Sequence, residues 1–228
     1  PIKEIGEIIK NYKLEAGSAA YPLFHTDAVQ AFQYLKCDVK ELGVDMLTLS
    51  AHKIYGPKGI GCLYIGNPGL LDPMVSGGGQ EYGMRSGTEN VPAIVGFAKA
   101  VEIAEDMRAE ESKRMVTLRD LLWDSIETIV PDAEVNGSID NRVPNNLNVY
   151  FPGHSAQDLC IELDIQGVAV SPGTACSSRV SQPSYVIEAL GFSGDRPSSS
   201  IRFSLGRQTT KAEIEAVSSI FKKRFGAK

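Results

Sequence analysis

The spacing of apolar residues along the chain changes several times. Between Ile2 and Leu14 they recur at helical intervals, which predicts a helix. The segments YPLFHTDAVQAF and VDMLTLSAHK begin with strand-like residues and end in polar ones, and GIGCLYIG predicts a further strand. The next run, VSGGGQEYGMRSGTEN, is too rich in glycine for a regular element. This order indicates a mixed α/β sheet with functional groups on the loops at the strand ends.

A long helical pattern begins at Val91 and continues through AIVGFAKAVEIAEDMRAEESKRMVTLRDLLWDSIETIV. Thr88 and Asn90, just before it, are candidate caps. Because a helix or helix pair of this length can bridge two domains, we expect one domain over residues 1–110 and another over residues 111–228.

Shorter patterns follow Pro131. They predict strands at NNLNVYF, GVAVS and SIRFSLG, and helices at SAQDLCIELD, at SYVIEALG and from Lys211 onwards. This alternation indicates a separate, small α/β domain.

The balance of charge limits the classes of partner. Lys and Arg total 23 against 28 Asp and Glu, a formal net charge of -5, whereas nucleic acids and anionic membranes attract positive proteins. No apolar stretch is long enough to span a bilayer, and the opening PIKEIGEIIK is too acidic for a signal peptide. We expect a cytoplasmic protein that binds small molecules or other proteins, and neither nucleic acid nor a membrane.

The four cysteines form no CxxC pair and have no Cys/His spacing of the zinc type, so neither a disulfide framework nor a metal site is expected. Cys37, Cys62 and Cys160 lie in apolar or helical contexts, where a cysteine is ordinarily a small buried side chain. Cys176 differs, because it lies in the loop-like run SPGTACSSRVSQPS.

Two residues at predicted strand ends suggest a cofactor. Asp27 follows the strand in LFHTD and Lys53 follows the strand in LTLSAHK, so neighbouring strand ends could present both to one ligand. Pyridoxal phosphate requires such a lysine for a Schiff base and an acidic partner for its pyridine nitrogen. An aspartate after a strand is more often a turn residue, however, and a loop lysine is usually only solvated.

The surrounding motifs, HTDAVQ and SAHKIYGPKGIG, resemble the cofactor motifs of the class V aminotransferase group of fold-type I enzymes. The resemblance implies that Asp27 pairs with the pyridine nitrogen, Gln30 binds the ring hydroxyl, Ser50 and His52 bind the phosphate, and Lys53 carries the cofactor. Lys58 in the same loop is the competing lysine. His25 is interpreted as structural.

The segment SPGTACSSRVSQPSYVIEALG resembles the catalytic loop of cysteine desulfurases of the long-loop kind. By that resemblance Cys176 is the nucleophile that takes sulfur from L-cysteine and holds it as a persulfide, leaving L-alanine. A thiolate that attacks sulfur needs exposure, which a loop of small residues provides.

Two more segments match this family. In SIRFSLGRQTT the first arginine, Arg202, binds the substrate carboxylate by resemblance, and a guanidinium suits that role because it binds carboxylates bidentately. Arg207 is interpreted as structural. In GMRSGTEN the resemblance assigns to Thr88 a contact with the phosphate in the neighbouring subunit, which implies a homodimer; helix capping is its alternative role.

The resemblance covers nearly the whole chain but corresponds to the C-terminal portion of the family pattern. It implies the C-terminal part of the large pyridoxal-phosphate domain, with an open sheet edge and uncovered apolar surface, followed by the small domain. The explanations for the missing part are a complementary N-terminal chain, a fragment, or a truncated gene. The family further implies a sulfur acceptor or iron-sulfur scaffold protein as partner, in iron-sulfur cluster or thio-cofactor assembly. A selenocysteine lyase, an aminotransferase and a non-catalytic fragment are the alternative functions.

Overall fold

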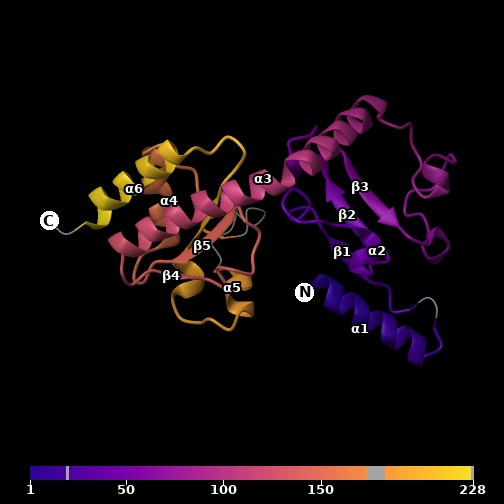
Figure 1. Ribbon diagram of the computed structural model, residues 1–228, viewed down its shortest axis with the longest axis horizontal. Coiled ribbons are helices and arrows are strands. Elements are labelled where there is room, and N and C mark those ends of the chain that lie inside the picture. Colours follow the sequence, from indigo (N-terminus) through magenta and orange to yellow (C-terminus); the bar gives the residue numbers. More distant parts are fainter. Residues whose placement is uncertain (19–20, 174–182, 227–228) are drawn as a thin grey trace. The chain divides into compact units, whose positions relative to one another are not determined.

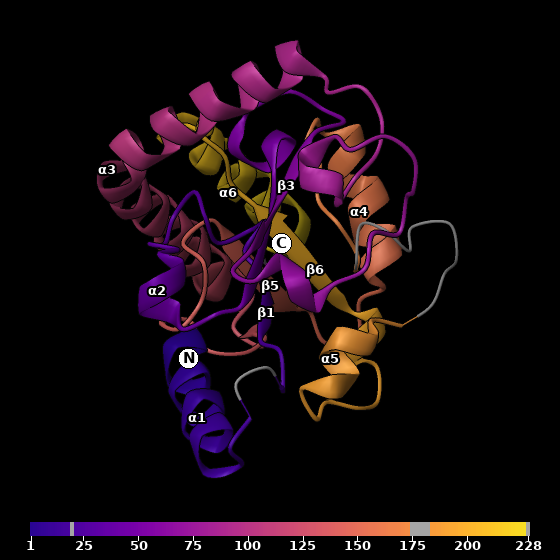
Figure 2. The same cartoon turned by 90° about the vertical axis from the view of Figure 1, so that its right-hand side faces the viewer.

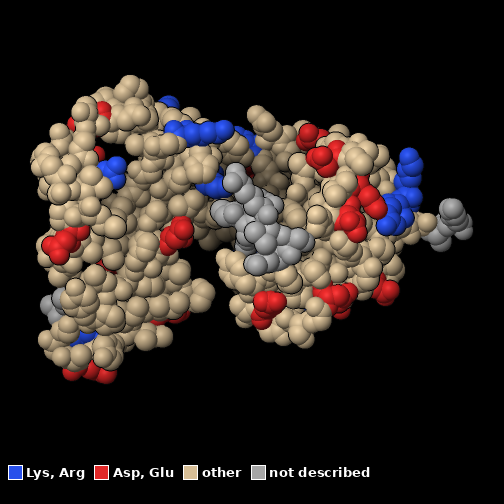
Figure 3. All heavy atoms as spheres, turned by 180° about the vertical axis from the view of Figure 1, so that it is seen from behind, with Lys and Arg blue, Asp and Glu red and all other residues tan. Residues whose placement is uncertain are grey.

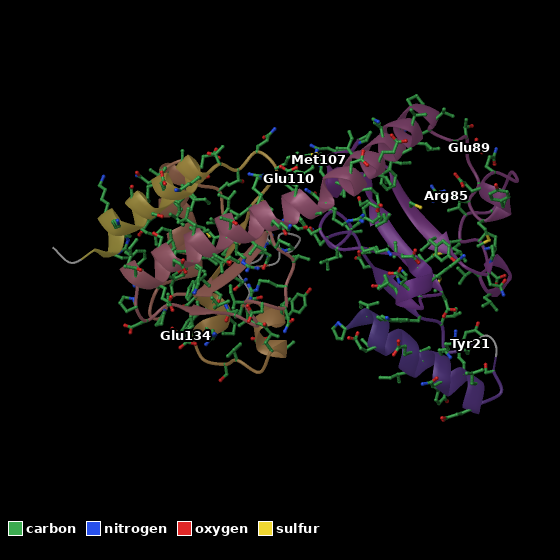
Figure 4. The ribbon with its side chains drawn as sticks, viewed as in Figure 1. Tyr21, Arg85, Glu89, Met107, Glu110 and Glu134 are labelled. Carbon is green, nitrogen blue, oxygen red and sulfur yellow. The ribbon has the colours of Figure 1, made fainter. Side chains whose placement is uncertain are left out.

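The computed structural model describes residues 1–18, 21–173 and 183–226 of the chain. It divides the chain into two compact units, Pro1–Ala109 (unit 1) and Glu110–Lys228 (unit 2). One long helix, α3 (Val91–Ile129), contributes to both units. The division falls on this helix near Met107 and Glu110, which Figure 4 labels.

Unit 1 contains a mixed sheet. Its elements follow the chain in the order α1 (Ile2–Glu15), β1 (His25–Asp27), α2 (Val39–Leu42), β2 (Met46–Ser50), the 3-10 helix η1 (Ala51–Ile54), β3 (Gly61–Ile65), two further 3-10 turns, η2 (Pro68–Leu70) and η3 (Glu81–Gly83), and the first part of α3. β1 pairs with β2 in parallel and β2 pairs with β3 antiparallel, so β2 is central (Figure 1). The mixed α/β sheet that the sequence indicates is confirmed.

The two faces of this sheet have different surroundings. Leu47 and Leu49 of β2 face the core, where Leu49 packs with Phe97 and Ala100 of α3. Side chains alternate along a strand, and the strand register therefore places a second set on the opposite face. That set, which we call the open face, includes His25, Asp27, Thr48, Ser50 and Leu63, together with Met46, Gly61 and Ile65. His25 and Asp27 are exposed and Leu63 is 49% exposed, so within unit 1 this face is largely uncovered.

Helix α1 packs closely on α2, which Figures 1 and 2 show beside it. Gly6 of α1 lies so near the carbonyl group of Leu42 that no larger residue would fit without a shift. Lys13 further attaches α1 to the sheet, because its Nζ donates to Asp45 Oδ2 over 2.8 Å. Asp45 Oδ2 also accepts from the backbone N–H of Phe24, just before β1. These contacts set the position of the strand that carries Asp27.

The other side of α1 presents an apolar stripe. Ile5, Ile8 and Tyr12 follow helical spacing and are 38%, 67% and 58% exposed. An exposed stripe of large apolar residues is typical of a contact surface.

Unit 2 contains an antiparallel sheet with helices. After the second part of α3 come β4 (Glu134–Val135), β5 (Asn146–Tyr150), α4 (Ala156–Ile165), α5 (Tyr185–Ala189), the 3-10 turn η5 (Arg196–Ser198), β6 (Ser200–Ser204) and α6 (Lys211–Phe225). The strand order is β4-β5-β6, and both pairs are antiparallel. Thr210 and Glu213 form a capping box at the start of α6.

The core of unit 2 lies on one face of this sheet. Leu147, Val149 and Ile201 are fully buried there. Phe151 and Phe221 are buried with them, and their rings lie 5.7 Å apart. The opposite face of the sheet is polar and carries Arg202, which the register pairs with Asn148.

At the edge of unit 2, Arg196 joins η5 to β4. It donates through Nε to Asn136 Oδ1 over 2.6 Å and forms an ion pair with Glu134, which Figure 4 labels on β4.

The structure corrects one prediction about regular elements and adds a helix that was not predicted. The segment GVAVS is not a strand: Gly167 adopts φ +81 and the Val168 N–H bonds to Leu163 O, so the segment begins as the C-terminal cap of α4. Only Ser171 makes a bridge, to Arg202. The short helix α2 was not predicted; Asp38 caps it by accepting from the N–H groups of Lys40 and Glu41.

The surface charge of the described residues and the apolarity of their helices do not point to a further kind of binding site. In the face that Figure 3 presents, Lys and Arg side chains lie at several separate places among Asp and Glu where described atoms are visible. Among the described residues, no helix has the length and apolarity that crossing a membrane requires. No group of three or more His, Cys, Asp or Glu side chains in residues 1–18, 21–173 and 183–226 could hold a metal ion.

The close packing of α1 on α2 can be tested with Gly6→Ala. The added methyl group overlaps the Leu42 carbonyl oxygen, and forcing such overlap costs about 3 kcal/mol, whereas alanine gains about 1 kcal/mol in a helix. We expect a net loss of about 2 kcal/mol in the free energy of unfolding, measured with urea. Gly79→Ala is the matched control, because nothing lies within 4 Å of its added Cβ. Equal stability of the two variants would contradict this packing.

Candidate active site

The carboxyl ends of β1 and β2 lie side by side in unit 1. Because the two strands are parallel and the register pairs Asp27 with Thr48, Asp27 ends β1 close to where Ser50 ends β2. Ligands of α/β sheets bind at such carboxyl ends. The structure therefore brings together, at the carboxyl ends of two neighbouring strands, the residues that the sequence places after two separate strands.

The 3-10 helix η1 determines which way the residues after β2 point. A 3-10 helix has three residues per turn, so Ala51 and Ile54 lie on the same side and are buried, at 0% and 2% exposure. His52 and Lys53 must then point away from the core, and both are exposed. Gly56, which follows, allows a close approach to α3, because an added Cβ would lie 3.0 Å from Ala100 Cβ.

Ser50 and His52 form a polar pair beside Lys53. Ser50 Oγ lies 2.8 Å from His52 Nδ1. A hydroxyl and an imidazole placed together can both donate to a phosphate. Lys53 Nζ has no hydrogen-bond or ion-pair partner among the described residues. The competing Lys58 is exposed in the turn before β3, beyond η1.

Asp27 has one carboxylate oxygen engaged. Its Oδ1 accepts the backbone N–H of Val29 over 2.9 Å, which holds the carboxylate at the start of the turn. Within the described chain, Oδ2 has no hydrogen-bond partner. Gln30 is exposed in the same turn, three residues beyond Asp27.

Thr88 is exposed in the loop before α3, in the stretch between Arg85 and Glu89 that Figure 4 labels. It does not cap the helix: the side-chain oxygen of Asn90 accepts the N–H of Ala93 over 3.3 Å. No hydrogen bond joins Thr88 to the strand-end residues in the described part of the chain.

Arg202 lies in unit 2, on the polar face of β6, and is partly buried. Its Nε is buried and has no hydrogen-bond partner among the described residues. Leaving a buried charged donor unpaired is costly, so such a group calls for a ligand or another partner. The backbone carbonyl oxygen of Arg207 accepts from Arg114 Nη2 over 2.8 Å, and the structural interpretation of the Arg207 side chain stays a prediction.

The segment that leads to Cys176 begins at Ser171, which pairs with Arg202. Ser171 and Arg202 exchange two backbone hydrogen bonds, of 2.8 and 3.2 Å, and Ser171 Oγ donates to Gly173 O over 2.9 Å. Cys176 itself lies outside the described residues.

The structure places two further histidines, His154 and His25, the second of which the sequence analysis interpreted as structural. His154 packs in unit 2, with its ring 5.2 Å from that of Phe225. His25 lies on the open face, and its Nε2 is 2.7 Å from Thr48 Oγ1. The sequence analysis gave no role to Thr48. Thr48 lies two residues before Ser50, so both side chains are on the same face of a strand that ends at a candidate site. That spacing is the signal that could have identified Thr48.

The residues of unit 1 fit a pyridoxal phosphate group. An unpartnered lysine, a carboxylate with one available oxygen and a hydroxyl-imidazole pair supply the three kinds of contact that this cofactor needs.

Comparisons with known proteins show the family to which the chain is similar. The family model for class-V aminotransferases matches residues 1–217. A cysteine desulfurase IscS of Clostridium botulinum is 41% identical over 225 residues, which cover 98% of this chain and 55% of the relative. Another IscS, from an Anaeromyxobacter species, is 47% identical over 219 residues, 95% of this chain and 52% of the relative.

Solved structures give the same result. A NifS-like protein superimposes with a TM-score of 0.85 at 32% identity, covering 98% of this chain and 56% of that one. A NifS-like protein from Rickettsia africae superimposes with a TM-score of 0.84 at 33% identity, covering 99% and 57%. The chain thus spans about half the length of the relatives it matches. Since the family model accounts for nearly all of it, the chain belongs to the class-V aminotransferase family.

Proposed function

We propose that this chain carries the lysine-containing part of the active site of a pyridoxal-phosphate-dependent cysteine desulfurase. The observation that carries the proposal is the placement of Asp27, Ser50, His52 and Lys53 at the adjoining ends of two parallel strands. Class-V aminotransferases depend on pyridoxal phosphate. Relatives at 41% and 47% identity are cysteine desulfurases.

The cofactor, when bound, supplies an electron sink that makes the bonds around the substrate α carbon easier to break. In this proposal Lys53 holds the cofactor and then moves a proton at the α carbon. Asp27 accepts the hydrogen bond of the ring nitrogen through its available oxygen. Ser50 and His52 bind the phosphate, and Gln30 binds the ring hydroxyl.

Arg202 and Cys176 supply the substrate chemistry. The Arg202 guanidinium, with its unpartnered buried Nε, binds the carboxylate of L-cysteine and orients the α carbon. The Cys176 thiolate attacks the substrate sulfur. A bond forms between the two sulfurs as the bond between Cβ and sulfur breaks, and the electron pair remains with Cβ. That carbon takes up a proton, so the products are L-alanine and a Cys176 persulfide.

The proposal extends to the assembly in which this chain works. Because the chain spans about half the length of its relatives, we propose that an N-terminal half completes the site, and that the stripe of Ile5, Ile8 and Tyr12 is part of the surface it covers. A homodimer in which Thr88 reaches the neighbouring cofactor belongs to the same proposal. So does a cytoplasmic role in passing sulfur to an acceptor or scaffold protein for iron-sulfur cluster assembly.

The remaining cysteines support the choice of Cys176 as nucleophile. Partial burial raises the thiol pKa of Cys37 and raises that of Cys160 to about 11. Desolvation also raises the thiol pKa of Cys62, but Cys62 is exposed and not buried as its sequence context suggests. A raised pKa keeps each thiol protonated at neutral pH, and only the thiolate attacks sulfur.

Binding of the cofactor is tested by its visible absorption. Pyridoxal phosphate is added to the chain alone and to the chain mixed with the N-terminal half of a relative. We expect a new visible absorption band, which is lost in Lys53→Ala. Borohydride reduction should remove the band while fixing the pyridoxyl group covalently on the Lys53 peptide. Lys58→Ala is the matched control and should retain the band. A band that survives in Lys53→Ala but disappears in Lys58→Ala would overturn the assignment.

The reaction is tested by measuring alanine released from L-cysteine by the cofactor-loaded protein. We expect Cys176→Ser to reduce release to background, because serine cannot take up sulfur, while Cys62→Ser retains it. Undiminished alanine from Cys176→Ser would contradict the mechanism. Turnover that instead requires a keto acid and is indifferent to Cys176 would identify an aminotransferase.

The protection of Cys160 is tested by alkylation with iodoacetamide, followed by quantification of its peptide. With a pKa of about 11, its thiolate is about 300-fold scarcer at neutral pH than that of an ordinary thiol, an effect offset about tenfold by the greater nucleophilicity of a more basic thiolate. We expect labelling roughly 30-fold slower than in urea, and acceleration as pH rises towards 11. Equal rates in buffer and urea would show that the thiol is not protected.

A further inference from the structure

The hydrogen bond between His25 and Thr48 has no part in the proposed reaction. His25 Nε2 lies 2.7 Å from Thr48 Oγ1, which is at the short end of the range for nitrogen and oxygen. The bond joins β1 to β2 across their parallel pairing, on the open face. Both side chains are polar, and His25 is exposed.

The register places this pair directly beside Asp27. Thr48 is the partner of Asp27 across the two strands, so their side chains point from the same face at about the 4.8 Å separation of neighbouring strands. His25 precedes Asp27 by two residues, and it therefore lies on the same face about 6.6 Å further back along β1. By rotating, the Thr48 hydroxyl can thus direct its proton either to the imidazole of His25 or to the carboxylate of Asp27.

In the tautomer whose Nε2 carries no proton, the Thr48 hydroxyl donates to His25, and the 2.7 Å contact then resolves this competition in favour of the imidazole. Thr48 Oγ1 is bound to His25, and Oδ1 of the Asp27 carboxylate accepts the N–H of Val29. Within the described residues, Oδ2 is left as an acceptor for a ligand. A hydroxyl that turned to Asp27 instead would donate to the carboxylate and weaken its bond to any other donor.

We propose that His25 and Thr48 are a positioning pair, in which His25 holds the Thr48 hydroxyl away from Asp27 so that one carboxylate oxygen remains available to the ring nitrogen of the cofactor. This inference rests on the proposed function. It assigns a role to a histidine whose ordinary interpretation is structural. Neither residue touches the reacting atoms in this scheme, and both act through Asp27.

The proposal makes an unusual prediction about paired substitutions. In His25→Leu the Thr48 hydroxyl loses its partner and turns to Asp27, so the affinity for pyridoxal phosphate should fall roughly three- to tenfold, the worth of one hydrogen bond. Adding Thr48→Val removes the hydroxyl that competes, and should restore affinity to within about twofold of the parent. A purely structural cross-strand bond predicts the opposite, because a second substitution could not recover what the first had lost.

The experiment titrates pyridoxal phosphate into the parent, His25→Leu and His25→Leu/Thr48→Val, in the form of the protein that gives the absorption band. It records the affinity and the pH midpoint of the spectrum of the bound cofactor. We expect both to change in the single variant and both to return in the double variant. His25→Leu/Thr26→Val is the matched control: Thr26 lies on the same strand but on the opposite face, so this double variant should stay weak. Urea unfolding of each variant without cofactor checks that all of them are folded.

The outcomes separate the two proposals. A parent without the absorption band overturns the proposed function and this inference with it. A parent with the band, together with an unchanged His25→Leu or a double variant that stays weak, overturns the positioning pair alone.

Discussion

The burial of Ala51 and Ile54 is the constraint on which the candidate site depends. These two side chains lie one 3-10 turn apart and are both withdrawn from solvent in the core formed with α3. Their burial leaves His52 and Lys53 no direction except outward. The backbone of Lys53 is thereby held in place, while its amine has no partner among the described residues. A lysine that binds a cofactor covalently requires both conditions. Gly56 contributes by letting the next segment approach α3 closely.

The same division between a buried and a polar face recurs in unit 2. Leu147, Val149 and Ile201 bury one face of the antiparallel sheet, and this directs Arg202 to the other. Its Nε is buried without a hydrogen-bond partner among the described residues, and burying a charged donor in that state is costly. Both units therefore use alternation along a strand to present functional groups: each inward side chain supplies stability, and its outward neighbours are left for chemistry. The two sets of groups, around Lys53 and around Arg202, belong to separate compact units.

Much of the secondary structure could be predicted from the apolar spacing. The helix from Ile2, the long helix from Val91, the strands before Asp27 and Ser50 and the final helix from Lys211 all occur. Strong periodicity over a long segment leaves few alternatives. The short elements were harder. GVAVS has strand-like composition, but the helix before it ends through Gly167 and Val168, and that local cap prevails over propensity.

The sequence by itself determined which chemical groups are present and in which motifs they stand: the lysine after one strand, the aspartate after another, the cysteine in a loop of small residues and the arginine on a late strand. Such assignments depend only on residue type and near neighbours. Tertiary structure alone decided the register that sets Thr48 opposite Asp27, the bond between Thr48 and His25, and the burial of Arg202 Nε without a partner among the described residues. Each depends on contacts between segments distant in sequence, and the pattern of apolar residues within one segment carries no information about its partner.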